Sequence, residues 1–317
     1  MHYVRRGHSF RFNKYAAPGP EAIKLAKQYP PVFPSKPELP DIPIGDAPVY
    51  DCDCVVACCA RDVKYLTAAV TSLVTQRFVN VRVHVVFDGF KPSLIVRREF
   101  QHWPNVVLYW HQANIGPYLS TMRVVQYMQT PYLAIQDADD VSMPYRLWHS
   151  CQILEQTKAA LVGGACVQSL APGEHVPAVR LAATHETYRF SGQVWDTAPL
   201  GMSLHPATTF SLKAFRAING YGDYMSAGDC EINTRLRAAG YKAIDAPTLY
   251  TVRQLRSESL SHGFEKARTT GYWEWVQSEL ASRYSEFAEL KNVRMFEPAA
   301  YGVLERETAS KDTMRFL

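Results

Sequence analysis

Apolar residues recur at two different spacings along residues 50–140, and the two spacings alternate. Short apolar runs, typical of buried strands, occupy residues 52–59, 81–87, 106–110 and 132–136. Segments with apolar residues three or four positions apart, as in amphipathic helices, lie between them at 62–76, 92–102 and 118–129. A chain in which strands and helices alternate folds into a mainly parallel sheet covered by helices on both faces. The pattern therefore predicts an α/β fold.

The second half of the chain alternates less regularly. Helices are expected over 144–156 and 229–239, and buried strands over 160–168 and over the pair 241–245 and 248–252. A strand followed directly by a short helix is expected over 210–218. These elements extend the predicted sheet.

The ends of the chain have a different character. Residues 18–48 are rich in proline and have no periodic pattern, which favours an extended arm. Helical spacing returns after residue 263. The sequence therefore predicts three parts: a basic, proline-rich extension over 1–49, a central domain over 50–262 and a helical tail over 263–317.

Charged residues follow three of the predicted strands directly. Arg61 and Asp62 follow the first strand, Asp88 follows the second, and Asp137–Asp140 (Asp-Ala-Asp-Asp) follows the fourth. In open parallel sheets ligands bind beyond the carboxyl ends of the strands, so these residues should meet at one crevice. Crowded carboxylates repel one another unless a cation lies among them. We therefore expect a metal-dependent enzyme that acts on a nucleotide or another phosphorylated donor.

Two common ways of binding phosphate are missing from the sequence. There is no G-x-G-x-x-G after the first strand, and no G-x-x-x-x-G-K-[ST] anywhere. Their absence argues against dinucleotide oxidoreductases and P-loop nucleotide hydrolases. A metal held by carboxylates is then the natural way to bind a diphosphate.

Composition narrows the setting of this chemistry. The 317 residues are 47% hydrophobic, carry a net charge of +4, and contain neither an apolar run long enough to span a bilayer nor a signal peptide, which predicts a cytoplasmic protein. Residues 1–27 are basic and interleaved with aromatic side chains. They fit a polyanion-binding arm and a packing extension equally well. The close cysteines Cys52, Cys54, Cys58 and Cys59 alternate along one strand, so we expect reduced core thiols rather than a zinc site.

From about Cys54 to Ser261 the chain resembles the family 2 glycosyltransferases of the GT-A fold. The matching segments occur in the family's order: Ser72-Leu73-Val74-Thr75-Gln76, Asp88-Gly89, Asn114-Ile115-Gly116, Asp137–Asp140, Pro144-Tyr145-Arg146-Leu147, His205-Pro206-Ala207-Thr208, Asn219-Gly220-Tyr221 and Gly228-Asp229-Cys230-Glu231. The resemblance implies transfer of a sugar from a nucleoside-diphosphate sugar to an acceptor hydroxyl, with inversion at the anomeric carbon.

The same resemblance implies roles on the donor side, in residues 50–140. Asp139 would coordinate Mn²⁺ or Mg²⁺, and Asp137 would contact the donor and the metal. Asp88 would contact the nucleoside. Three further residues are candidates for the donor site: Arg61, Asp62 and Arg253. Leu255 stands where the family often has a metal-binding histidine, so a third protein ligand is not assigned.

On the acceptor side, in residues 141–262, Asp229 is the candidate general base. A carboxylate near an acceptor hydroxyl can take its proton as the oxygen attacks. An aspartate at a helix start also caps backbone amides, and both roles remain open. His205 and Glu231 are candidate acceptor contacts.

The sequence is also compatible with other acceptors and other activities. The acceptor is expected to be a glycan or a lipid-linked saccharide; hydroxylated bases of viral DNA, held by the basic arm, are the alternative. A sugar nucleotidyltransferase and a non-catalytic sugar-nucleotide-binding protein share the expected fold. The tail, with its aromatic residues, is expected to cover the acceptor cleft or to form a homodimer through its helices.

Overall fold

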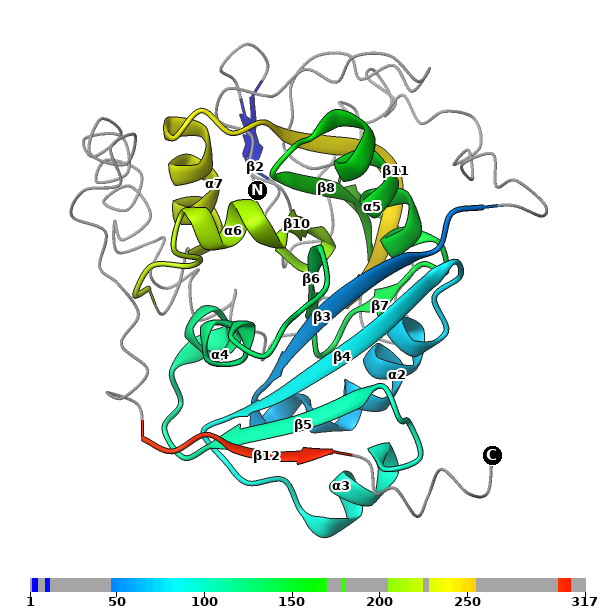
Figure 1. Cartoon of the computed structure of the whole chain (residues 1–317), viewed down its shortest axis with the longest axis vertical. Coiled ribbons are helices and arrows are strands. Elements are labelled where there is room, and N and C mark those ends of the chain that lie inside the picture. Colours follow the sequence, from blue (N-terminus) through cyan, green and yellow to red (C-terminus); the bar gives the residue numbers. More distant parts are fainter. Residues whose placement is uncertain are drawn as a thin grey trace.

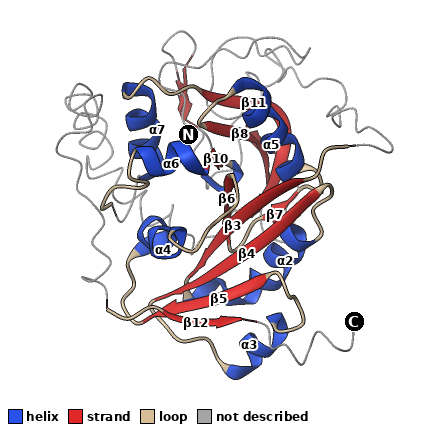
Figure 2. Cartoon of the chain, in the orientation of Figure 1, coloured by secondary structure: helices blue, strands red, loops and turns tan. Residues whose placement is uncertain are grey.

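The protein contains one large mixed sheet with helices packed on both of its faces (Figures 1 and 2). The structure is a computed structural model that describes residues 2–4, 9–11, 47–169, 178–180, 205–224, 228–254 and 302–308. The predicted α/β class with a mostly parallel central sheet is confirmed. Most of the extension 1–49 and of the tail 263–317 lies outside the described residues, and so does the proposed homodimer contact.

The sheet has ten strands in the order β12-β5-β4-β3-β6-β10-β8-β11-β7, with β9 paired to β8. The strands are β3 (Tyr50–Cys58), β4 (Val79–Asp88), β5 (Val106–His111), β6 (Tyr132–Asp137), β7 (Val141–Ser142), β8 (Leu161–Ser169), β9 (Ala178–Arg180), β10 (Thr209–Ser211), β11 (Ala243–Gln254) and β12 (Glu305–Thr308). A separate antiparallel pair consists of β1 (His2–Val4) and β2 (Ser9–Arg11).

The helices are α2 (Val63–Val74), α3 (Leu94–Phe100), α4 (Gly116–Val125), α5 (Arg146–Thr157), α6 (Leu212–Ala217) and α7 (Gly228–Ala238), with single 3-10 turns η1 (Ala60–Asp62) and η2 (His205–Ala207). Alternate residues of β3 separate them into two layers. Cys54 faces a core shared with α2, α3 and α5, whereas Val55 faces a core shared with α4, α6 and α7. Burial on both faces explains the continuous apolar strands.

The strand order reverses beside β3, and this reversal positions the candidate site. The chain passes from β3 through β4 to β5 in one direction and then returns to the other side of β3 as β6; β3 is parallel to both of its neighbours. In such sheets the crevice at the reversal lies outside the carboxyl ends of the strands. Ala57 of β3 pairs with Asp137 of β6, so the acidic segment lies at this crevice.

Two elements differ from the sequence expectation. The expected pair 241–245 and 248–252 is one strand, β11, whose register with β8 shifts between Ala246 and Leu249. Pro247 lies in this bulge, where a residue without an N–H group does not interrupt the ladder. Residues 305–308, in the predicted helical tail, form the edge strand β12 against β5. The short, charged sequence Glu305–Thr308 has no apolar alternation that would predict a strand.

A buried contact between Asp53 and His84 connects β3 to β4. The Asp53 carboxylate contacts His84 Nε2 at 2.7 Å and accepts hydrogen bonds from the backbone amides of Gln129 and Thr130, both at 3.1 Å. Burial raises the pKa of Asp53, but the bonds from His84 and Thr130 outweigh it and lower that pKa below its ordinary value. The ionised carboxylate therefore stabilises the fold.

This pair predicts a specific pH dependence of stability. A carboxyl whose pKa is lowered by folding contributes stability above its unfolded pKa of about 3.9, and this contribution is lost as the pH falls through the folded value. The urea midpoint should therefore fall less between about pH 5 and pH 3 in Asp53→Asn than in the wild type. Asp51→Asn, which changes an exposed carboxylate on the same strand, should keep the wild-type slope. Equal slopes in all three proteins would contradict the assignment.

Candidate active site

The candidate site lies beyond the carboxyl ends of β3, β4 and β6 (Figure 1). Cys58, at the end of β3, lies close to several carboxylates, and their negative charge changes the pKa of its thiol. Burial raises the pKa of Cys58, and the nearby carboxylates of Asp62, Asp139 and Asp88 raise it further. The strand register agrees: Cys58 of β3 pairs with Phe87 of β4, beside Asp88, and Ala57 pairs with Asp137 of β6, so the acidic ends of the three strands lie side by side.

Asp88 holds the turn that begins α4. Its two carboxylate oxygens accept hydrogen bonds from the backbone amides of Ile115 at 2.8 Å and Gly116 at 2.9 Å. Gly89 fits against this turn because it has no side chain: a Cβ there would lie 2.9 Å from Cβ of Asn114. The matching Asp-Gly and Asn-x-Gly segments thus form one structural unit. A contact of Asp88 with the nucleoside stays a prediction.

Asp137 lies between basic side chains. Its Oδ1 is 3.7 Å from His205 Nδ1, and its carboxylate is about one third exposed. Burial raises the pKa of Asp137, but the interaction with His205 and the charges of Arg253 and Arg146 outweigh it, so the pKa is lowered. Asp137, His205 and Arg253, which come from β6, η2 and β11, therefore lie in one place.

The carboxylates of the Asp-Ala-Asp-Asp segment suit a divalent ion that is shared with a phosphorylated ligand. Asp139 is partly exposed at this loop, whereas Asp140 is fully buried. Among the described residues, no three His, Cys, Asp or Glu side chains form a complete metal cage. Mg²⁺ is commonly held by one or two carboxylates together with substrate phosphates, and this donor set fits that mode of binding.

Arg61 and Asp62 follow β3 in the turn η1. The Arg61 side chain is 41% exposed and lies 4.0 Å from the Asp62 carboxylate, a weak contact. The Cys59 thiol donates to the same carboxylate at 2.9 Å. These residues lie just beyond the carboxyl end of β3, and the exposed Arg61 side chain is accessible to an anionic ligand. Their donor contacts stay predictions.

Arg146 holds the acidic loop in place through buried hydrogen bonds. Its buried guanidinium donates to Gln136 Oε1 at 2.6 Å, to Ser142 Oγ at 2.8 Å and to the carbonyl oxygens of Ile135 and Thr208. Gln136 in turn donates to the carbonyl oxygen of Asp140 at 2.6 Å. One side chain therefore connects the strand before the loop, the strand after it, and the segment that follows His205.

The family-like Ser-Leu-x-x-Gln segment on α2 supports the same loop. Ser72 Oγ accepts a hydrogen bond from the Ser142 amide at 3.0 Å. Gln76 donates to the Met143 carbonyl at 2.8 Å and accepts from the Leu147 amide at 3.0 Å. The motif thus orients the residues after the metal segment.

Replacing Arg146 should therefore destabilise the protein rather than remove a ligand contact. Arg146→Met keeps the length of the side chain but leaves several buried acceptors without a donor, and it should lower the free energy of unfolding by about 2–4 kcal/mol. Urea unfolding measures this change. The exposed Arg82→Met is the control, and it should stay within about 0.5 kcal/mol of the wild type. A stable Arg146→Met protein would show that this network does not hold the loop.

Asp229 lies in the first turn of α7. Because the helix begins at Gly228, Asp229 lies inside the helix. The helix dipole stabilises its negative charge in this first turn. Its Oδ1 accepts a hydrogen bond from the Tyr118 hydroxyl at 3.0 Å. The Tyr118 ring packs on His205, with 4.9 Å between ring centres, and His205 faces Asp137. A chain of contacts thus joins the candidate base to the metal segment.

Glu231 has a structural environment. It is buried and forms an ion pair with Arg235, 2.5 Å from Nε to Oε1, while the Gly222 amide donates to Oε2 at 3.3 Å. Arg235 also donates to the carbonyl oxygens of Ile218 and Gly220. Both charges are used to hold the 218–222 turn beside α7. A contact of Glu231 with the acceptor stays a prediction.

Two tyrosines of the site, Tyr118 and Tyr221, were given no role from the sequence. Tyr221 bonds to His205 Nε2 at 3.0 Å, and its ring lies 5.1 Å from that of Tyr118. Tyr118 follows the Asn-x-Gly turn and Tyr221 ends the Asn-Gly-Tyr turn. The only signal was their position beside family-like segments, because spacing alone does not show that they meet.

Cys52, Cys54 and Cys58 are buried and unbridged, as expected, whereas the unbridged Cys59 is only partly buried and is not a core thiol. None of the helices in the described residues is both long and apolar enough to cross a bilayer.

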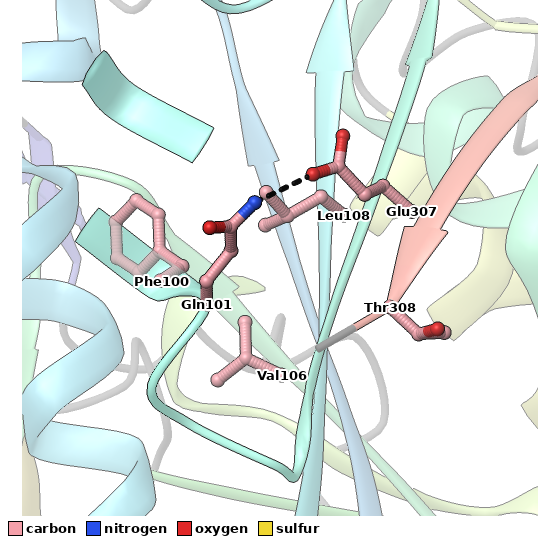
Figure 3. Close-up of a pocket in the computed structure, with 6 residues that line it drawn as sticks. All are labelled: Phe100, Gln101, Val106, Leu108, Glu307 and Thr308. Carbon is pink, nitrogen blue, oxygen red and sulfur yellow. Dashed lines mark hydrogen bonds between the residues drawn. The ribbon is translucent and has the colours of Figure 1, made fainter. Parts of the chain in front are cut away.

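Figure 3 shows a small pocket between α3 and β12, where Gln101 bonds to Glu307. Val106, which begins β5, lines this pocket, so it lies at the opposite end of the strands from the candidate site.

The sheet order, the strand-end carboxylates and the acidic first turn of α7 define a GT-A fold of the glycosyltransferase type. The chain belongs to glycosyl transferase family 2, whose family model matches residues 53–218. No curated protein matches the chain.

Solved structures agree with this fold. The mannosyltransferase PcManGT from Pyrobaculum calidifontis, bound to GDP-Man and Mn²⁺, matches with a TM-score of 0.53 and 16% identity over 69% of this chain and 62% of its own. TarS 1–349 from S. aureus, bound to UDP-GlcNAc, matches with a TM-score of 0.51 and 15% identity over 66% and 60%. The chain spans only 37% of the longer TarS structure, which has a TM-score of 0.50. At this identity the likeness shows the fold.

Proposed function

We propose that this family 2 glycosyltransferase moves a sugar from a nucleoside-diphosphate sugar to an acceptor hydroxyl with inversion, and that it depends on Mn²⁺ or Mg²⁺. One observation carries the proposal: the acidic ends of β3, β4 and β6 lie side by side at the switch point of the sheet, and Asp229 is connected to them through Tyr118 and His205. Similar folds hold UDP-GlcNAc, or GDP-Man with Mn²⁺, which supports a nucleotide sugar as the donor.

On the donor side, Asp139 and Asp137 would hold the metal ion. The bound ion would offset negative charge on the departing diphosphate. Arg253 and Arg61 add positive charge to the same crevice, and the Asp88 turn would contact the nucleoside. His205, whose Nδ1 lies 3.7 Å from Asp137 Oδ1, would help to orient this carboxylate.

On the acceptor side, Asp229 would act as the general base. As the acceptor oxygen bonds to the anomeric carbon, its proton passes to the Asp229 carboxylate. The bond between the anomeric carbon and the diphosphate oxygen breaks, and its electron pair leaves with the nucleoside diphosphate. Attack and departure on opposite faces of the sugar give inversion.

The acceptor proposed is a glycan or a lipid-linked saccharide. Hydroxylated bases of viral DNA form the second candidate, which rests on the basic and aromatic residues of the extension 1–49. Binding to DNA should then weaken steeply between low and moderate salt and should be lost when residues 1–16 are removed.

We place the reaction in the cytoplasm because the unbridged thiols suit a reducing compartment.

The full chain should be incubated with several nucleotide sugars, with Mn²⁺, with Mg²⁺ or with a chelator, and with each class of acceptor. Metal-dependent release of nucleoside diphosphate supports the transferase. Formation of nucleoside triphosphate from pyrophosphate would instead indicate a nucleotidyltransferase. Donor binding without any product, across all acceptor classes, would indicate a binding protein.

A further inference from the structure

The ring of Tyr118 fits against the bare first turn of α7. Gly228 begins that helix, and a Cβ on Gly228 would lie 2.6 Å from Cγ of Tyr118, closer than real Cβ contacts. The ring therefore occupies space that any other residue at position 228 would fill. His205 and Tyr221 pack on the ring, at 4.9 and 5.1 Å between ring centres. Tyr118 is thus held firmly beside Asp229.

The donors near Asp229 meet only one of its two oxygens. Tyr118 Oη donates to Oδ1 at 3.0 Å, and the Cys230 thiol lies 3.6 Å from the same atom. Within the described parts of the chain, Oδ2 has no hydrogen-bond partner. The Asp229 side chain is partly exposed. One oxygen is therefore held by the protein and the other remains available to a ligand.

The Tyr118 hydroxyl remains a donor across the working pH range. Burial raises the pKa of Tyr118 well above its ordinary value, and the negative charge of Asp229 raises it further. A phenol that stays protonated donates to the carboxylate whether or not substrate is bound.

We propose that Tyr118 is a positioning residue that locks Oδ1 of Asp229, so that Oδ2 is the atom that takes the proton of the acceptor hydroxyl. The inference rests on the proposed function, in which Asp229 is the general base. Without the lock the carboxylate rotates about its χ angles, and fewer bound complexes have Oδ2 in line with the acceptor proton. A loss of this alignment lowers turnover more than substrate binding.

Tyr118→Phe tests the proposal because it removes only the hydroxyl and keeps the ring against Gly228. We expect kcat to fall about 10- to 100-fold, with the donor KM and the unfolding midpoint close to those of the wild type. Tyr109→Phe is the matched control: it removes another buried phenol hydroxyl, one that bonds to His84 Nδ1 at 3.2 Å away from the site. Its kcat should be unchanged.

A second variant, on α7, tests the same interaction between Tyr118 and Asp229. Gly228→Ala pushes the Tyr118 ring away, and we expect kcat to fall at least as much as in Tyr118→Phe. The double variant Gly228→Ala with Tyr118→Phe should then be no slower than Gly228→Ala alone, because both changes break one interaction. Additive losses would show two independent effects and would overturn the proposal.

The activity of the wild-type protein tests the proposed function, on which this inference rests. If it releases no nucleoside diphosphate with any donor and acceptor, the proposed function fails. If it turns over and Tyr118→Phe keeps the wild-type kcat, the positioning role fails while the function stands. A fall in kcat accompanied by an equal loss of donor binding or of stability would show that Tyr118 is only structural.

Discussion

Asp139→Asn should remove metal-dependent donor binding. Asparagine keeps the shape of the side chain but loses the charge that holds a divalent ion beside a diphosphate. We expect the affinity for a nucleotide sugar in Mn²⁺ to fall by about 100-fold or more, to the level that the wild type shows with a chelator. Calorimetric titration with the donor, and titration with Mn²⁺ alone, measure both parts of the effect without requiring turnover.

The control for this change is Asp51→Asn. Asp51 is an exposed carboxylate near the amino end of β3, opposite the site, where it accepts a hydrogen bond from Asn80 at 2.9 Å. Its removal changes the net charge equally and should leave donor and Mn²⁺ binding unchanged. If Asp139→Asn binds the donor in Mn²⁺ as tightly as Asp51→Asn does, the metal role of Asp139 is wrong.

Asp229→Asn should separate binding from turnover. The amide oxygen can still accept the hydrogen bond from Tyr118, so the local packing is kept, but a neutral amide does not take a proton from the acceptor. We expect kcat to fall by about 10²- to 10⁴-fold while the donor dissociation constant stays near the wild-type value. Initial rates of nucleoside diphosphate release and donor titrations measure the two quantities.

Glu99→Gln provides the comparison for Asp229→Asn. Glu99 lies exposed on α3, where Thr67 donates to its carboxylate at 2.5 Å, and its neutralisation should not change the rate. A near-normal rate in Asp229→Asn would reject the general base. Loss of donor binding in the same variant would instead place Asp229 on the donor side of the crevice.

The apolar pattern predicted the parallel core well, because each of its strands is a continuous apolar run and each of its helices repeats apolar residues at helical spacing. The expected elements over 52–59, 62–76 and 81–87 correspond to β3, α2 and β4 within a few residues. The edge strand β12 was missed for the opposite reason. Its residues alternate charges: Glu307 pairs with Arg97 at 2.7 Å, while Arg306 lies over the rings of Tyr109 and Tyr127.

The family-like motifs were found in the sequence, but several of their physical roles were not. The matching segments give no role to Gln76 or Arg146, and both side chains support the acidic loop through buried hydrogen bonds. Glu231 is a candidate acceptor contact from the resemblance, and the structure adds that its carboxylate is paired with Arg235. A motif shows that a residue type is required at a position; its partner shows what the residue does there.

The sequence by itself determined that carboxylates end three strands of one parallel sheet, because apolar runs mark the strands and a common chain direction places all such ends at the same edge. Only the tertiary structure decided which side chains face them. Tyr118 and Asp229 are 111 positions apart, and Asp137 and His205 belong to different elements. Contacts of this kind depend on how helices pack across the sheet, and no local pattern of hydrophobic and polar residues records that packing.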